Sequence, residues 1–229
     1  MVVGNGMMAV AFSAFNADPS VMLFASGVSN SLETDPAPFA RETDLLLQIR
    51  ESHPKALLVY FSTCSIHDPD RRDTPYVRHK LAMEATLAAC NGRWLVLRIP
   101  LAIGPGQRGS TLAPFLYERI SRGESFDVWA NAVRFPIDVD DLVRIVGRLV
   151  KDRGLWNRTI NVALGAFPVL DFVRAMEKIV GKSAICNVVQ KGKLYEVHCP
   201  EVAAIAAELN LDFGPQYLER VLLKYFARP

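Results

Sequence analysis

The sequence lacks the features that mark several classes of protein. Its four cysteines form no C-x-x-C pair, and no His/Cys spacing makes a zinc site. The formal net charge is only +2 and the basic residues are scattered, which argues against nucleic acid and anionic membranes as partners. The apolar run from Met7 to Phe15 is too short to span a bilayer, and no charged segment of a secretory signal precedes it. We therefore expect a cytoplasmic protein with reduced thiols and no metal.

What the sequence does contain is a large apolar fraction in alternating segments. Half of the 229 residues are hydrophobic, enough for one large domain or one domain with a small lobe. The patterns predict strands at 1–3, 21–25, 56–61, 93–100, 125–130 and 159–163 and helices at 39–52, 76–91, 111–122, 139–151, 168–180, 200–210 and 215–226. Strands that alternate with helices favour an α/β fold with a mainly parallel sheet. Shorter, mixed elements follow residue 110.

A strand, a polar loop and a helix bring reactive side chains together. The apolar run Ala56–Phe61 leads to Thr63, and about a dozen residues later Tyr76 and Lys80 open a helix. Residues four apart lie on one helix face, so the phenol and the ammonium can share a site. A cation lowers a phenol pKa, and a hydroxyl such as Thr63 can bond the reacting oxygen. The pattern predicts a general acid/base at Tyr76, with a surface Tyr and Lys on an ordinary helix as the alternative.

A glycine turn follows the first strand directly. Gly4-Asn5-Gly6-Met7-Met8-Ala9 has the form G-x-G-x-x-A, in which absent side chains let the backbone approach a pyrophosphate. The turn predicts dinucleotide binding at the start of the chain. A plain turn between a strand and a helix remains the alternative.

Together these segments resemble the short-chain dehydrogenase/reductase superfamily, and within it the NAD-dependent sugar-nucleotide epimerase/dehydratase family. The resemblance covers nearly the whole chain with gaps and is strongest from Ser62 to Gly106. It implies a Rossmann-like core at 1–110, rejoined by the strand at 159–163, and a mostly substrate-binding lobe at 111–229. It implies catalytic roles for Thr63, Tyr76 and Lys80. It also implies cofactor contacts at Gly4, Gly6, Met7, Met8, Ala25, Ser26, Tyr76, Lys80 and Pro100, and substrate contacts at Ser26, His67 and Arg134.

The chain departs from that family in several places. From Gly6 to Ser26 there is room for one short helix and one strand, so two strands and the acidic residue that holds the adenosine ribose are missing. We therefore expect weak binding of NAD or NADP. Leu101 stands where the family often has a substrate-binding asparagine, and Pro136 and Asp138 depart from the family residues that follow its arginine. The dehydratases carry Asp-Glu after the threonine, where this chain has Cys64-Ser65, so 4,6-dehydration is not expected.

The resemblance implies an NAD(P)-dependent epimerase or reductase that acts on a nucleotide-activated sugar, with surface-polysaccharide biosynthesis as its expected setting. It also implies a homodimer formed through the helices at 39–52 and 76–91. The alternative, favoured by the missing strands, is a non-catalytic descendant that binds a ligand or a partner. Retention of Thr63, Tyr76 and Lys80 together argues for the enzyme.

Overall fold

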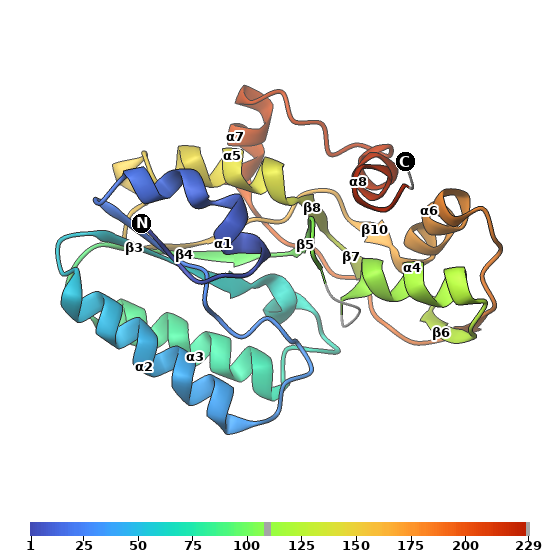
Figure 1. Cartoon of the computed structure of the whole chain (residues 1–229), viewed down its shortest axis with the longest axis horizontal. Helices are drawn as coiled ribbons and strands as arrows, with labels where there is room; N and C mark the ends of the chain where they lie inside the picture. The colour runs from blue at the N-terminus through green and yellow to red at the C-terminus, as the bar shows by residue number, and fades with distance from the viewer. Residues whose placement is uncertain (108–110, 228–229) are drawn as a thin grey trace.

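The computed structural model describes residues 1–107 and 111–227, and its centre is a parallel five-stranded sheet (Figure 1). The sheet has the order β1-β2-β3-β4-β9 and every neighbouring pair is parallel. Its strands are β1 (Val2–Val3), β2 (Val21–Phe24), β3 (Leu57–Thr63), β4 (Trp94–Ile99) and β9 (Arg158–Asn161). The predicted α/β fold with a mainly parallel sheet is confirmed.

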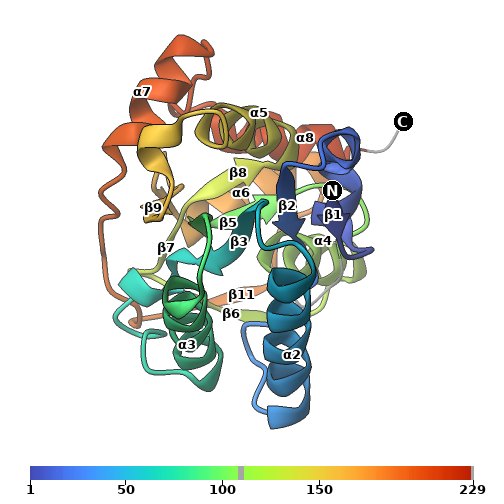
Figure 2. The ribbon, with the colours of Figure 1, turned by 90° about the vertical axis from the view of Figure 1, so that its left-hand side faces the viewer.

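Both faces of this sheet are buried, as a parallel sheet requires. All seven residues of β3 are buried, and its hydrophobic side chains alternate between two hydrophobic clusters. One cluster lies between the sheet and the helices α2 (Pro36–Ser52) and α3 (Pro75–Ala89). The other lies between the sheet and the helices α1 (Met7–Ala11), α5 (Val139–Leu149) and α7 (Pro200–Glu208). Figure 2 shows α2 and α3 side by side below the sheet, with α5 and α7 above it.

Capping residues set where the two lower helices begin. The Asp35 carboxylate accepts from the Ala37 N–H at 2.9 Å, and Pro36 fills the first helical position, so α2 begins before the predicted Phe39. The Thr74 hydroxyl accepts from the Val77 N–H at 3.3 Å, again with a proline behind the cap. This start places Tyr76 in the first turn of α3.

The sheet ends at β1, in agreement with the missing strands. A short α1 and the 3-10 helix η1 (Ser13–Ala17) are the helical segments between β1 and β2. Within the described residues, no strand pairs with the outer edge of β1. The adenosine side of a dinucleotide would therefore meet an open sheet edge.

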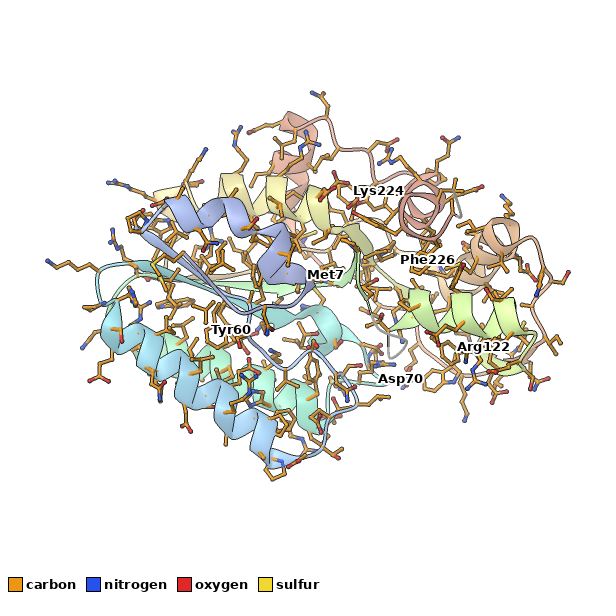
Figure 3. All side chains as sticks on the ribbon, in the orientation of Figure 1. Met7, Tyr60, Asp70, Arg122, Lys224 and Phe226 are labelled. Carbon is orange, nitrogen blue, oxygen red and sulfur yellow. The ribbon has the colours of Figure 1, made fainter. Side chains whose placement is uncertain are left out.

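A third hydrophobic cluster lies beyond the carboxyl ends of the strands, at the right of Figure 1. It is built from α4 (Leu112–Arg122), β6 (Phe126–Trp129), α6 (Val169–Val180), β11 (Cys186–Val189) and α8 (Tyr217–Phe226). In Figure 3, Met7 lies between the sheet and this cluster. The core of the sheet extends past residue 110, because α5 and α7 pack on it.

The remaining elements are short. They are η2 (Cys64–His67), β5 (Leu101–Ile103), β7 (Val133–Arg134), β8 (Pro136–Asp138), η3 (Arg153–Leu155) and β10 (Phe167–Pro168). Strand β5 pairs with β8, and β7 pairs with β10. None of the helices in the described part of the chain has the length and apolar character to cross a membrane.

We expect alanine substitutions at two glycines to have opposite effects on stability. Gly4 has φ +136° and a Cβ there would lie 2.5 Å from the Ala25 carbonyl oxygen, so Gly4→Ala should cost about 2 kcal/mol or more. Gly147 lies within α5, where a Cβ would meet only Phe15 at 4.0 Å, so Gly147→Ala should stabilise by up to about 1 kcal/mol. Urea unfolding measures the unfolding free energy of both variants. A change in the same direction in both would contradict the strained conformation assigned to Gly4.

Candidate active site

A cavity of about 320 Å³ lies where β2, β3 and β4 end. The carboxyl ends of parallel strands are where open α/β sheets bind ligands. The sequence-predicted residues that line the cavity are Met7, Met8, Ala25, Thr63, Tyr76, Lys80, Pro100 and Arg134. Side chains predicted for the nicotinamide end and for the substrate therefore face one space.

Thr63 and Tyr76 meet at one wall of this cavity. Thr63 ends β3 and its oxygen accepts from the Ser65 N–H at 3.1 Å, which leaves the hydroxyl proton for another partner. Burial raises the pKa of Tyr76 to about 12, although its hydrogen bond with the Thr63 hydroxyl acts to lower it. At neutral pH Tyr76 is therefore a phenol.

Lys80 lies one helical turn after Tyr76 and is 2% exposed. Its ammonium donates to Glu42 Oε1 at 2.9 Å and to the Tyr60 hydroxyl at 3.1 Å, and lies 5.8 Å from the centroid of the Tyr76 ring. Within the described residues these bonds occupy two of its three N–H donors, which leaves the third for a ligand in the cavity. Burial lowers the pKa of Lys80, and the Glu42 carboxylate opposes that effect.

A second hydroxyl beside Thr63 is already engaged. Ser62 donates to Glu84 Oε1 at 2.5 Å, and Arg98 binds the same carboxylate through two bonds of 2.9 and 2.6 Å. This cluster ties β3 and β4 to α3 behind the cavity. Because Ser62 serves it, Thr63, which bonds Tyr76, is the one of these two hydroxyls that can act together with Tyr76 on a substrate.

Two arginines also line the cavity. Arg71 and Arg134 share the buried carboxylate of Asp68, at 3.9 and 3.3 Å. Burial and the neighbouring Arg134 charge lower the pKa of Arg71 below its usual value. Two guanidinium groups against one carboxylate leave a net positive charge that faces the cavity, which suits an anion such as a phosphate.

The thiol next to Thr63 is not reactive. Cys64 is buried and its sulfur donates to the Arg98 carbonyl oxygen at 2.9 Å. Burial raises the pKa of Cys64 to about 12, so the thiolate that a nucleophile needs does not form near neutral pH. Among the described residues, no three His, Cys, Asp or Glu side chains gather in a way that could hold a metal ion.

Four predicted site residues lie outside the lining of the cavity. Gly4 and Gly6 belong to the turn beside it, and Arg41 binds the hydroxyl and the carbonyl oxygen of Ser26 at 3.4 and 2.9 Å. His67 lies against Asn161, with 3.1 Å between Nε2 and Oδ1, and is not among the residues that line the cavity. The predicted contact between His67 and substrate therefore has no support from the geometry.

Other residues of the site were not predicted. Asp68, Arg71, Gln107 and Tyr195 line the cavity, and Glu42 lies behind it. Gln107 has a buried Oε1 that finds no hydrogen-bond partner within the described residues. Arg71 lies in the loop between Thr63 and Tyr76, so its place in the sequence could have predicted that it belongs to the site. Tyr195 comes from the distant tail, where the sequence gives no such signal.

Comparison with known proteins places these features in a family. A sequence profile of the NAD dependent epimerase/dehydratase family matches residues 12–163. The chain belongs to this family. No curated protein sequence matches it.

Solved structures of this epimerase/dehydratase fold match nearly the whole chain. The UDP-glucose 4-epimerase of Thermus thermophilus, in complex with NAD, is 18% identical, with a TM-score of 0.69 over 96% of this chain and 81% of that one. RMD from Pseudomonas aeruginosa, complexed with NADPH, is 17% identical, with a TM-score of 0.74 over 96% and 95%. The UDP-glucuronic acid 4-epimerase of Bacillus cereus is 18% identical, with a TM-score of 0.70 over 94% and 76%. At these identities the likeness establishes the fold.

The residues fit the family's dinucleotide at one end. At the nicotinamide end, Tyr76, Pro100 and the remaining donor of Lys80 face the cavity, and a Cβ on Gly6 would meet nothing within 4 Å, which leaves space beside the turn. At the adenosine end, the acidic residue nearest to the turn is Asp18, which instead accepts bonds from the backbone and hydroxyl of Ser20 at 2.9 and 2.6 Å. The fit is therefore good for the nicotinamide half and poor for the adenosine half.

We expect the buried Glu42 to make the protein sensitive to acid. Burial acts to raise its pKa, but hydrogen bonds from His79, Tyr60 and Val28 and the Lys80 charge outweigh it and lower the pKa from 4.5 to about 2. A lowered pKa stabilises the fold above about pH 4.5, and this contribution is lost as the pH falls towards 2. Unfolding free energy should drop by up to about 3 kcal/mol over that window. The drop should be smaller in Glu42→Gln, and an equal drop in both proteins would contradict the assignment.

Proposed function

We propose that the protein is an NAD(P)-dependent epimerase or reductase that acts on a nucleotide-activated sugar. The observation that carries this proposal is the meeting of two groups of residues in one cavity. Thr63, Tyr76 and Lys80 supply proton chemistry, and Arg71 and Arg134 supply an anion site. Two of the relatives named above are UDP-sugar epimerases by their own descriptions, which supports the same class here.

The chain's own residues divide the work. Tyr76 exchanges a proton with the oxygen of the sugar through its phenol, and Thr63 orients that oxygen. Lys80 would hold the nicotinamide ribose with its remaining donor. When bound, the dinucleotide supplies or accepts the hydride that accompanies the proton.

The arginine pair gives the substrate its orientation. Arg71 and Arg134 bind the diphosphate of the nucleotide, because a guanidinium fork matches phosphate oxygens. Gln107 Oε1, which has no partner among the described residues, is an acceptor for a sugar hydroxyl. Leu101 lines the cavity where the family often has a polar residue, so the sugar meets an apolar surface there.

Epimerisation or carbonyl reduction suits this site better than dehydration. Elimination of water needs an added acid and base next to Thr63. Cys64 is buried with a raised pKa, and Ser65 gives its backbone N–H to Thr63. Neither residue is a proton donor of the kind that elimination requires.

One observation favours a non-catalytic ligand-binding protein as the second candidate. Within the described residues β1 is an edge strand, and Asp18, the acidic residue nearest to the glycine turn along the chain, bonds Ser20 instead. Such a protein would bind the nucleotide sugar at Arg71 and Arg134 without turnover. The first test below separates the two candidates.

The assembly and setting are part of the proposal. Leu47 on α2 and Leu81 on α3 are 41% and 38% exposed, which supports a homodimer through these two helices. All four cysteines are free thiols, which supports the reducing cytoplasm as the location. Surface-polysaccharide biosynthesis, a consumer of nucleotide-activated sugars, is the process we propose.

Removal of the Tyr76 hydroxyl should abolish turnover and spare the fold. Tyr76→Phe is expected to lower the rate by about 100-fold or more, since general acid/base catalysis contributes that much. NADH or NADPH oxidation with a panel of UDP- and GDP-linked keto sugars, and NMR detection of epimers with NAD, measure the rate. Tyr225→Phe removes the same group from α8, where it bonds Asp138 at 2.6 Å, and should leave turnover unchanged. Full activity of Tyr76→Phe would contradict the assignment, and absence of turnover in the wild type alongside nucleotide-sugar binding would favour the second candidate.

Dinucleotides should bind weakly and with little discrimination. A missing charge-assisted hydrogen bond to the adenosine ribose costs about 1.5 to 3 kcal/mol, which is about tenfold to a hundredfold in affinity. Isothermal titration with NADH, NADPH and reduced nicotinamide mononucleotide measures this directly. The dissociation constant of the mononucleotide should lie within about tenfold of that of NADH, because the adenosine of NADH makes few contacts at an open sheet edge. Sub-micromolar binding of one dinucleotide with strong rejection of the other would show that the edge is closed.

A further inference from the structure

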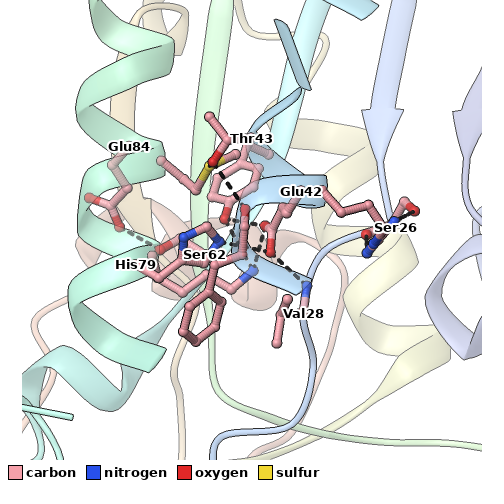
Figure 4. A network of polar contacts seen from close by, with 12 residues as sticks. Ser26, Val28, Glu42, Thr43, Ser62, His79 and Glu84 are labelled. Carbon is pink, nitrogen blue, oxygen red and sulfur yellow. Dashed lines mark hydrogen bonds and ion pairs between the residues drawn. The ribbon is translucent and has the colours of Figure 1, made fainter. Parts of the chain in front are cut away.

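A fully buried carboxylate lies behind the cavity, on α2. Glu42 is 0% exposed and accepts four hydrogen bonds (Figure 4). Its Oε1 accepts from the Tyr60 hydroxyl at 2.6 Å and from the Lys80 ammonium at 2.9 Å. Its Oε2 accepts from the Val28 N–H at 2.7 Å and lies 3.1 Å from His79 Nε2. Because a carboxylate only accepts, His79 must carry its proton on Nε2 here.

These four donors come from three separate parts of the fold. Val28 follows β2, Tyr60 lies in β3, and His79 and Lys80 lie in α3. An ionised carboxylate that receives this many bonds stays ionised, and the lowered pKa of Glu42 agrees. The network therefore holds one full negative charge against the Lys80 ammonium.

The backbone at Gly27 closes one side of the pair off from solvent. Lys80 is 2% exposed, and a Cβ on Gly27 would lie 2.8 Å from both Glu42 Oε1 and Lys80 Nζ. The backbone of Gly27 thus covers the two charges directly, with no room for water between them. In such a site a charge acts on its neighbours more strongly than at the surface.

Tyr76 is the neighbour that this arrangement affects. The charged and titratable groups around it are Lys80 from α3, Glu42 from α2 with His79 bound to it, and Tyr60 from β3, while Glu84 is tied to Arg98 farther along α3. A bare ammonium would stabilise a phenolate at Tyr76. Here the carboxylate offsets the ammonium charge, and it adds to burial in raising the pKa of Tyr76.

We propose that Glu42 is a positioning residue for this site: by pairing with Lys80 it offsets the cation next to Tyr76 and adds to burial in keeping the phenol protonated at neutral pH. Tyr76 then rests as a proton donor. This proposal extends the proposed function, and rests on it only for the statement that the Tyr76 proton is transferred to a substrate. A resting phenol suits addition of hydrogen to a sugar carbonyl, in which the phenolic proton goes to the carbonyl oxygen, a hydride from a reduced nicotinamide goes to the carbon, and solvent reprotonates Tyr76.

NMR titration of the whole protein carrying ¹³C-labelled tyrosine tests the proposal without substrate or cofactor. The resonance that is absent from Tyr76→Phe identifies Tyr76. In the wild type it should keep its phenol position up to about pH 10. In Glu42→Gln its midpoint should fall by about one pH unit, since the carboxylate charge that helps to raise it is then gone.

Glu84→Gln is the matched control. It removes the same charge from a buried carboxylate that bonds Ser62 and Arg98, and it should leave the Tyr76 midpoint in place. An unchanged midpoint in Glu42→Gln, or an equal shift in Glu84→Gln, would overturn the proposal. If Glu42→Gln fails to fold, the wild type still decides, because a Tyr76 phenolate between about pH 7 and 9 would also overturn it.

The titration and the turnover assay fail independently. If Tyr76 of the wild type is a phenolate at neutral pH, the role of Glu42 is contradicted and the proposed function is not. Full activity of Tyr76→Phe would remove the proposed function and leave the titration result standing.

Discussion

Parallel pairing of β2, β3 and β4 is the constraint on which the rest of the structure depends. It aligns the carboxyl ends of the strands, so the segments that follow each strand must meet at one edge of the sheet. Thr63 ends β3, Pro100 follows β4 and Ala25 follows β2, and all three line the same cavity. The C-terminal part of the chain closes that cavity from the far side with Arg134 and Tyr195. Chemistry is possible here because hydrogen bonding within the sheet fixes the positions of residues that are distant in sequence.

Buried charge is the second organising feature. Glu42 with Lys80, Glu84 with Arg98, and Asp68 with Arg71 and Arg134 each place ionised groups close to the cavity. A buried pair is costly to desolvate and strongly destabilising when one partner is removed. These pairs also fix the angle of α3 against the sheet, since Lys80 and Glu84 both lie on that helix. The same contacts that hold the helix therefore set the electrostatic surroundings of Tyr76.

The sequence was sufficient for those parts of the site that depend on local spacing. Thr63, Tyr76 and Lys80 could be predicted because a strand end and the first turns of the next helix carry them. Glu42 could not, since it lies 38 residues before Lys80 on a helix whose pattern gives no sign of a buried carboxylate. His67 was expected at the substrate from the family resemblance, but its ring lies against Asn161. Side-chain direction in irregular segments depends on tertiary contacts that spacing does not encode.

The shortened sheet was also legible in the sequence, because the distance from Gly6 to Ser26 leaves no room for two more strands. Its consequence for binding depends on where the dinucleotide and the sugar lie, so a crystal structure with UDP and a reduced nicotinamide dinucleotide is the most direct test of this account. We predict the nicotinamide beside Thr63, Tyr76 and Lys80 with its adenosine in solvent, and the diphosphate of UDP on Arg71 and Arg134. A dinucleotide bound away from Tyr76, or a diphosphate that contacts neither arginine, would contradict it.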